Sequence, residues 1–115
     1  MESVTPQPKT VTDSDLTLTR ASIEDAARRL DGIVRRTPLE DCPRLSEQTG
    51  ATIRLKREDL QTVRSYKIRG AYNIMAQLTE QELAAGVVAA SAGNHAQGVA
   101  YACATMRVNG RIYVP

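Results

Sequence analysis

The run GVVAASAGNHAQGVAYACATM occupies residues 86–106 of the chain. Its first five residues are small and apolar, which is typical of a buried strand in a parallel sheet. Ser91 to His95 form a tight polar turn, and the alanine-rich residues 96–106 predict a helix. A buried strand that passes through a short loop into a helix is the repeating unit of parallel α/β folds.

The segments on either side of this run extend the same pattern. Residues 112–114 predict another strand, and residues 51–56 alternate apolar and polar side chains as a strand does. Ser65 is a suitable cap for a helix from Tyr66 to about Leu78. The order strand, helix, strand, helix, strand therefore predicts an α/β fold with a parallel sheet.

Capping and turn residues predict further short elements. Ser22, followed closely by two acidic residues, marks a helix start. Pro43 begins a short helix that Gly50 ends, because Pro suits the first turn of a helix and Gly suits the position after its last residue. Residues 79–82 predict a capped turn or a short helix.

The composition is that of an ordinary soluble globular domain, with 115 residues of which 42% are hydrophobic and 24% charged. The net charge of +2 is too small to indicate nucleic-acid binding. No apolar run approaches the roughly 18 residues of a membrane span, and the N-terminus lacks a secretory signal. Cys42 and Cys103 have no metal-ligand or redox spacing, so we expect reduced thiols in a cytoplasmic protein.

The two ends of the chain differ from its middle. Residues 1–17 are polar and have no apolar period, so we expect a disordered tail there and a folded domain over residues 18–115. Residues 111–114 are strand-like and are followed at once by Pro115. We therefore expect the domain to be incomplete at its C-terminal end.

Lys67 lies near the start of the helix predicted from Tyr66. The positive end of the helix dipole and the nearby Arg69 both disfavour another positive charge, so we expect the Lys67 amine to lose its proton readily. Such an amine is a nucleophile that forms a Schiff base with a carbonyl group. Gly70 leaves room for another group to approach this helix. The alternative is a solvated helix lysine, as most lysines are.

The loop of residues 91–95, Ser-Ala-Gly-Asn-His, joins the buried strand to the next helix. Free N–H groups at a helix N-terminus attract anions, and ligands bind parallel α/β sheets at the carboxyl ends of the strands. We expect a carboxylate here, with phosphate as the competing ligand. The alternative is a capping turn with Asn94 as the N-cap. His95, the only histidine, is either a general base or a residue that shapes the loop.

Two long motifs together resemble the threonine dehydratase (threonine ammonia-lyase) family. The first is KREDLQ at residues 56–61 followed by SYKIRGAYN at residues 65–73, and the second is SAGNHAQGVA at residues 91–100. The similarity runs from about Arg36 to Pro115, and the first motif resembles the biosynthetic branch more than the degradative one. Members are pyridoxal-phosphate (PLP) enzymes with the tryptophan synthase β-subunit fold. The resemblance therefore implies the N-terminal portion of that catalytic domain.

The resemblance also implies a role for individual residues. Lys67 corresponds to the lysine whose amine carries PLP, and Tyr66 to the aromatic residue that packs beside the cofactor. Asn94 corresponds to the asparagine that hydrogen-bonds the 3′-oxygen of the pyridine ring. The pocket for the substrate carboxylate corresponds to the same loop, namely Ser91, Ala92, Gly93, Asn94 and His95.

The chain departs from the family pattern at three places. Thr62 stands where Pro is common, and residues 106–110 are an unusual approach to the last strand. In the family, the glycine-rich loop that holds the PLP phosphate and the residue that faces the pyridine nitrogen both come later than the segment that ends here at Pro115. We therefore expect this chain by itself to bind PLP poorly.

The resemblance implies a cytoplasmic, PLP-dependent lyase that converts L-threonine to 2-oxobutanoate and ammonia, the first step of isoleucine biosynthesis. Lys67, once released from PLP, is the implied base for the α-proton. The parent protein is implied to be a homo-oligomer that has a small amino-acid substrate and no nucleic-acid, membrane or metal partner. The alternatives are L-serine dehydratase, serine racemase or degradative threonine dehydratase on the same fold. An alternative of another class is a fragment with no activity of its own.

Overall fold

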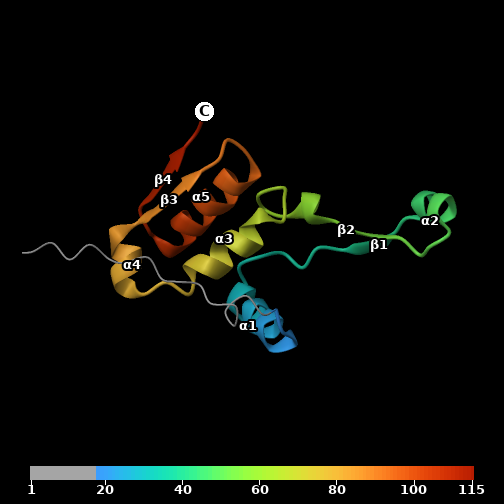
Figure 1. Cartoon of the computed structure of the whole chain (residues 1–115), viewed down its shortest axis with the longest axis horizontal. Helices are drawn as coiled ribbons and strands as arrows, with labels where there is room; N and C mark the ends of the chain where they lie inside the picture. The colour runs from blue at the N-terminus through green and yellow to red at the C-terminus, as the bar shows by residue number, and fades with distance from the viewer. Residues whose placement is uncertain (1–17) are drawn as a thin grey trace, which may run out of the picture.

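The structure is a computed structural model that describes residues 18–115 (Figure 1). The tail expected at residues 1–17 lies outside the described residues. The elements in chain order are α1 (Arg20–Leu30), β1 (Leu39–Asp41), α2 (Pro43–Thr49), β2 (Arg54–Lys56), the 3-10 helix η2 (Glu58–Leu60), α3 (Lys67–Met75), α4 (Glu80–Ala85), β3 (Val87–Ala90), α5 (Asn94–Met106) and β4 (Gly110–Tyr113).

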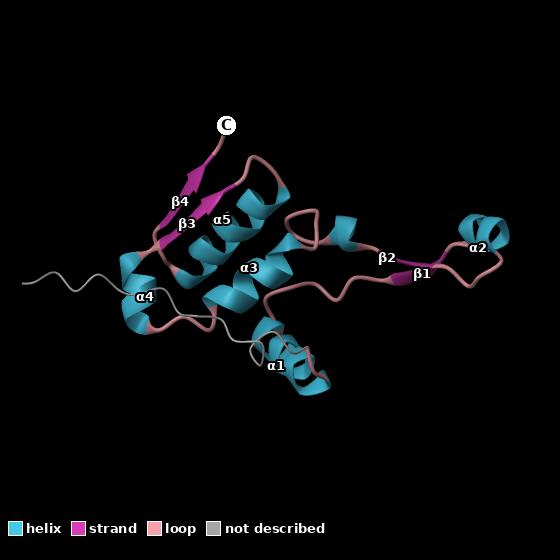
Figure 2. Ribbon diagram, viewed as in Figure 1, coloured by secondary structure: helices cyan, strands magenta, loops and turns pink. Residues whose placement is uncertain are grey.

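Strands β3 and β4 form a parallel pair with α5 as the connection between them (Figure 2). The register runs from Val87 opposite Gly110 to Ala90 opposite Tyr113. Parallel neighbours need such a crossover, because a tight turn can join only antiparallel strands. This unit confirms the strand–loop–helix–strand pattern predicted from the run at residues 86–106.

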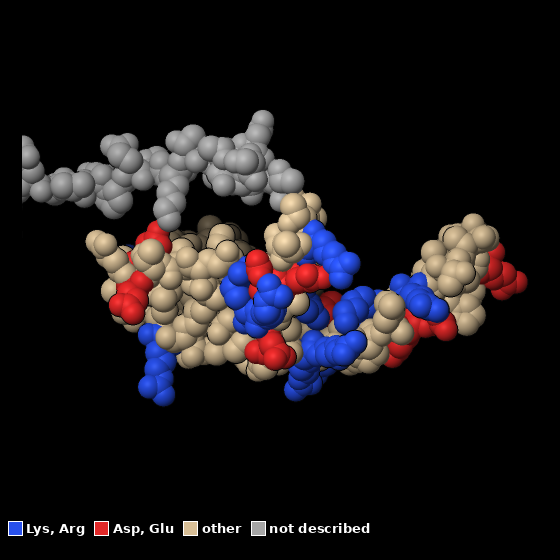
Figure 3. All heavy atoms as spheres, turned by 90° about the horizontal axis from the view of Figure 1, so that it is seen from below, with Lys and Arg blue, Asp and Glu red and all other residues tan. Residues whose placement is uncertain are grey.

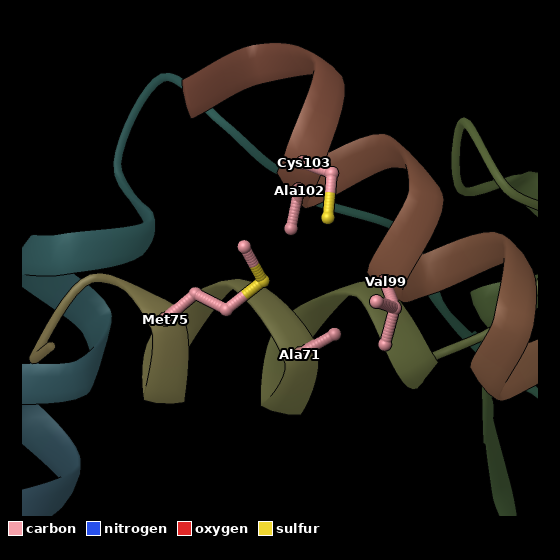
Figure 4. Close-up of a cluster of buried hydrophobic side chains, with 5 residues drawn as sticks. All are labelled: Ala71, Met75, Val99, Ala102 and Cys103. Atoms are coloured by element: carbon pink, nitrogen blue, oxygen red, sulfur yellow. The ribbon is translucent and has the colours of Figure 1, made fainter. Parts of the chain in front are cut away.

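The core lies between α3 and α5 (Figure 4). Ala71 and Met75 of α3 point toward Val99, Ala102 and Cys103 of α5, and all five side chains are buried. Alanines on both helices let the two backbones come close, and the flexible Met75 fills the remaining gap. The first turn of α3 therefore lies beside α5, which places the two sequence motifs next to one another.

The strand predicted at residues 51–56 exists, but it does not join the parallel sheet. It is the shorter β2, which pairs antiparallel with β1, from Leu39 opposite Lys56 to Asp41 opposite Arg54. This pair lies away from β3 and β4 (Figure 1), and all of its residues are exposed. The prediction of one sheet from all three strands is thus wrong, because alternation identifies a strand and says nothing about its partner.

Ion pairs connect the polar side chains around β1 and β2. Arg54 binds Asp41 at 2.8 Å, and Arg57 binds both Glu40 at 2.7 Å and Asp59 at 2.8 Å. Figure 3 shows basic and acidic side chains intermixed over this part of the surface. Exposed pairs of this kind contribute little stability individually, at most about 1 kcal/mol each.

Several helix ends differ from their predicted positions. Helix α1 begins earlier than expected, because Thr19 is its N-cap and Ser22 is the third helical residue, with which Thr19 forms a reciprocal capping box. Helix α3 ends at Met75, short of Leu78. Helix α2 begins at Pro43 and is followed by Gly50, whose φ of 68° is left-handed, as predicted.

Two other features of the described residues bear on the sequence predictions. Residues 79–82 do begin a short helix, α4, through a capping box between Thr79 and Glu82. Cys42 and Cys103 are both free thiols, as their spacing predicted. No helix within residues 18–115 has the length and apolar character needed to cross a bilayer.

Candidate functional site

Lys67 is the first residue of α3, and Tyr66 is the N-cap. The Tyr66 side chain makes no capping hydrogen bond, and the nearest substitute is the Ser65 hydroxyl, which accepts from the Lys67 N–H at 3.4 Å. Ser65 is 7% exposed, so its hydroxyl lies inside the fold. The prediction placed Lys67 at the helix start correctly, with Ser65 one residue before the cap position.

The Lys67 amine lies 5.1 Å from the centre of the Tyr66 ring. Lys67 is half-buried, whereas Tyr66 is exposed. A cation this close to a ring face is attracted by the ring quadrupole, by about 0.5–1 kcal/mol at an exposed site. The ring and the amine therefore form one unit at the surface of α3, which is the neighbourhood that the resemblance implied.

Lys67 lines a cavity of about 260 Å³ at the junction of α3 and α5. The cavity is lined by residues of both motifs, since His95 of α5 lines it together with Lys67 and Tyr66. Its complete lining is Tyr66, Lys67, Arg69, Gly70, Ala71 and His95. The structure therefore brings His95 to the same cavity as Lys67, whereas residues 91–94 do not line it.

The loop at residues 91–93 connects β3 directly to the start of α5. The Ser91 N–H donates to the Tyr113 carbonyl at 3.0 Å, and the Gly93 N–H donates to the Ser91 hydroxyl at 3.2 Å. Gly93, not Asn94, is the N-cap of α5, and no side chain caps this helix. The interpretation of Asn94 as an N-cap is therefore wrong. Within the described residues the Asn94 side chain makes no hydrogen bond, and the residue is exposed.

Gly98 is the point at which the two motifs touch. A β-carbon on Gly98 would lie 2.9 Å from the Lys67 carbonyl carbon and 3.1 Å from the Ile68 nitrogen. The sequence interpretation assigned the close approach to Gly70, but a β-carbon there would meet nothing within 4 Å. Of these two glycines, only Gly98 is needed for the close packing of α3 against α5. The sequence analysis did not identify it, although it lies four residues after Asn94 in the second motif.

Arg69 was expected to act as an additional cation beside Lys67, and the structure pairs it with a carboxylate. Glu58 accepts from Arg69 Nε and Nη2, each at 2.8 Å, and from the Thr37 hydroxyl. The hydrogen bonds from Arg69 are the main cause that lowers the pKa of Glu58 from 4.5 to about 2. The Arg69 charge is thus largely neutralised by a residue that the sequence analysis did not single out.

Gln61, the last residue of the first motif, holds the chain segment before Pro38. Its side chain is 1% exposed, accepts from the Arg35 N–H at 3.1 Å and donates to the Arg35 carbonyl at 2.8 Å. A buried amide that satisfies both main-chain groups of one residue fixes that residue in two directions. The glutamine of the KREDLQ motif therefore has a structural role, in addition to the resemblance of this motif to the family.

Comparison with known proteins places these motifs in a family. The model of the family described as pyridoxal-phosphate dependent enzyme matches residues 30–115. The chain is 65% identical over 95 residues to the biosynthetic L-threonine dehydratase IlvA of Corynebacterium glutamicum, which covers 83% of this chain and 22% of that protein. The chain thus spans less than a quarter of the length of the curated relatives it matches.

Solved structures give the same fold. The processed form of threonine deaminase isoform 2 from Solanum lycopersicum aligns with a TM-score of 0.73 and 38% identity, over 95% of this chain and 31% of that one. Maize serine racemase aligns with a TM-score of 0.76 and 33% identity, over 84% of this chain and 30% of that one. The chain belongs to the family of pyridoxal-phosphate dependent enzymes and forms the N-terminal portion of the tryptophan synthase β-like fold.

Proposed function

We propose that residues 18–115 are the N-terminal part of a catalytic domain that converts L-threonine to 2-oxobutanoate and ammonia, with Lys67 as the residue that carries PLP. The observation that carries this proposal is the cavity lined by both Lys67 and His95, at which residues of the two motifs meet. The identity of 65% to a biosynthetic threonine dehydratase supports the choice of substrate.

The residues around this cavity fit the chemistry of PLP. The cofactor has an aldehyde, an aromatic ring and a phosphate, and the site offers a primary amine, the exposed ring of Tyr66 and the uncapped N-terminus of α5. Free N–H groups at a helix N-terminus and the unused amide of Asn94 are donors that suit an anion or a ring oxygen. When bound, PLP supplies an electron sink for the carbon from which the substrate proton is removed.

The residues of this chain then have separate tasks in the proposal. The Lys67 amine binds the cofactor and later accepts the α-proton of threonine. The Asn94 amide donates to the ring 3′-oxygen, and Tyr66 packs beside the ring. The substrate carboxylate binds the loop of residues 91–95, and His95 at the cavity wall orients that loop. Threonine loses its β-hydroxyl as water, and hydrolysis of the resulting enamine by one water molecule releases ammonia and 2-oxobutanoate. The water lost in the first stage is taken up in the second, so the atoms balance.

A serine-directed activity is the second candidate, since maize serine racemase aligns with a TM-score of 0.76. The two activities share a PLP-bearing lysine and differ in the fate of the substrate. Release of 2-oxobutanoate from threonine supports dehydration of threonine, whereas conversion of L-serine to its mirror image supports racemisation. A cytoplasmic location and a homo-oligomeric parent are part of the same proposal.

The test uses a graft in which this chain replaces the matching segment of the Corynebacterium glutamicum relative. We expect threonine-dependent 2-oxobutanoate from the graft, and none from the graft with Lys67→Ala. The 115-residue chain alone is expected to form no 2-oxobutanoate. Its parallel sheet has only two strands within residues 18–115, and large apolar side chains such as Val88 of β3 and Ile74 of α3 are exposed there. A folded graft that is inactive, beside an active unmodified relative, contradicts the proposal.

A further inference from the structure

We infer that Glu58 is a positioning residue for Lys67: through Arg69 it holds the first turn of α3, and so the Lys67 amine, in place at the cavity. The part of this inference that concerns the cofactor rests on the function proposed above. The part that concerns the helix does not, because it follows from contacts within the chain.

The start of α3 lacks the capping box that fixes the starts of α1 and α4. Helices α1 and α4 each begin with a reciprocal capping box, whereas the N-cap of α3, Tyr66, makes no side-chain hydrogen bond. An uncapped helix end frays unless tertiary contacts hold it. The position of Lys67, the first helical residue, therefore depends on contacts that the rest of the first turn makes.

Glu58 supplies such a contact from outside the helix. Its carboxylate accepts two bonds from the Arg69 guanidinium, each at 2.8 Å, in the side-on geometry that fixes both distance and orientation. The Glu58 side chain is 15% exposed, so water screens this pair less than it screens the surface pairs. Arg69 lies two residues after Lys67, in the same helical turn.

The segment on which Glu58 rests is itself held firmly. The Thr37 hydroxyl donates to Glu58, and the Thr37 carbonyl accepts from Lys56 Nζ at 2.6 Å. The Gln61 amide clamps Arg35 at both its N–H and its carbonyl. Residues 35–37 and 56–61 therefore form one hydrogen-bonded base, and the pair of Glu58 with Arg69 transmits its position to α3.

A second contact holds the first turn of α3, and it comes from α5. Gly98 of α5 lies against the Lys67 carbonyl, so main chain meets main chain without a side chain between them. Loss of the Glu58 carboxylate would leave the first turn held by this contact, by the fully buried Ile68 side chain and by the longer hydrogen bond from Arg69 Nη2 to the Arg35 carbonyl at 3.4 Å. It would also leave the Arg69 guanidinium without a carboxylate partner at the cavity that Arg69 and Lys67 both line. Two effects on Lys67 therefore follow from one substitution, a less fixed helix start and a new neighbouring charge.

The experiment uses the whole 115-residue chain with Glu58→Gln, Arg69→Gln and the double variant. Asp59→Asn is the matched control, since it removes the neighbouring carboxylate of η2, whose partner Arg57 also pairs with Glu40 of β1. Hydrogen exchange followed by mass spectrometry reports the amides of residues 67–71. Acetylation of the Lys67 amine, measured against a lysine peptide in the same tube, reports its position without any cofactor.

We expect Glu58→Gln to speed exchange at residues 67–71 by about tenfold or more, because a charge-assisted hydrogen bond is lost. In the same variant, the rate at which the Lys67 amine is acetylated should change by at least about threefold, which corresponds to part of the free energy of that hydrogen bond. The double variant should return the acetylation rate toward the native value, because no unpaired guanidinium remains, and Asp59→Asn should match the native chain. If the Glu58→Gln variant does not fold, the rate of hydrogen exchange at residues 67–71 in the double variant tests the inference instead.

Native exchange and native acetylation in Glu58→Gln would overturn the inference. Faster exchange with an unchanged Lys67 acetylation rate would also overturn it, because Glu58 would then be a structural residue only. Incorporation of PLP after borohydride reduction is measured on the same samples. If the native chain and the graft both fail to place PLP on Lys67, the proposed function fails, while the acetylation rates still decide the role of Glu58.

Discussion

Gly98 of α5 lies so close to Lys67 of α3 that a β-carbon at residue 98 would stand 2.9 Å from the Lys67 carbonyl carbon. The neighbouring atoms are main chain, which cannot rotate away as a side chain does. The contact sets how near the lysine-bearing helix comes to the helix that follows the Ser-Ala-Gly-Asn-His loop. The distance between the two motifs in the fold therefore depends on the absence of a β-carbon at residue 98.

Gly98→Ala is expected to push α3 away from α5 and to destabilise the chain by about 1–3 kcal/mol, as overpacking of a filled core does. Urea denaturation measures this change. Gly70→Ala is the matched control, because it makes the same substitution in α3 where nothing lies within 4 Å. That variant should be neutral or more stable by up to about 1 kcal/mol, since Ala favours a helix over Gly. Equal effects of the two substitutions would show that the contact is unimportant.

Asn94→Ala separates the two interpretations of the loop. Gly93 already occupies the N-cap of α5, and the Asn94 side chain makes no hydrogen bond to any residue in the described range 18–115, so the melting temperature should not fall. If Asn94 donates to the cofactor, kcat of the graft should fall about 10- to 100-fold, the worth of one hydrogen bond to a charged group. Thermal melting and steady-state kinetics of the same preparation check both statements. A lower melting temperature with unchanged kcat would mean that Asn94 is structural.

Glu58 gives a prediction for the dependence of stability on pH. Arg69 holds the pKa of this carboxylate at about 2 in the folded chain, below its ordinary value of 4.5. A group with a lowered folded pKa adds stability above the unfolded pKa and loses it as pH falls toward the folded one. The contribution, about 1.5–3 kcal/mol for a charge-assisted pair, is therefore full above pH 4.5 and decreases from there toward pH 2.

The difference in unfolding free energy between the native chain and Glu58→Gln measures this contribution directly. The gap should be largest near pH 6 and should narrow steadily between pH 4.5 and pH 2, the interval between the two pKa values. Asp59→Asn is the control, since the Asp59 side chain is 58% exposed whereas that of Glu58 is 15% exposed. A gap that stays constant across this interval would mean that Glu58 does not stabilise the fold through its charge.

The sequence was sufficient for the features that depend on neighbouring residues. The α2 helix between Pro43 and Gly50, and the strand–loop–helix run at residues 86–106, follow from local propensity and capping, and both are present. The position of Lys67 at a helix start also follows from local signals. These predictions need no knowledge of what the segment packs against.

Features that depend on distant partners were not predictable in the same way. The pairing of β2 with β1 is set by residues 13 or more positions apart, and alternation carries no information about a partner. The pair of Glu58 with Arg69, and the contact of Gly98 with Lys67, likewise join different elements. The sequence alone does not identify a partner for Arg69, and only the fold shows that Glu58 pairs with its charge.

The central claim is that the Lys67 amine carries PLP, and borohydride reduction followed by peptide mapping tests it most directly. The graft is incubated with PLP, reduced and digested, and the lysines are compared. The other lysine of the described residues, Lys56, is the internal control, because its Nζ already donates to the Thr37 carbonyl at 2.6 Å. The account predicts the cofactor on the peptide that contains Lys67 and no cofactor there in Lys67→Ala. A label on Lys56, or equal labelling of both lysines, would contradict it.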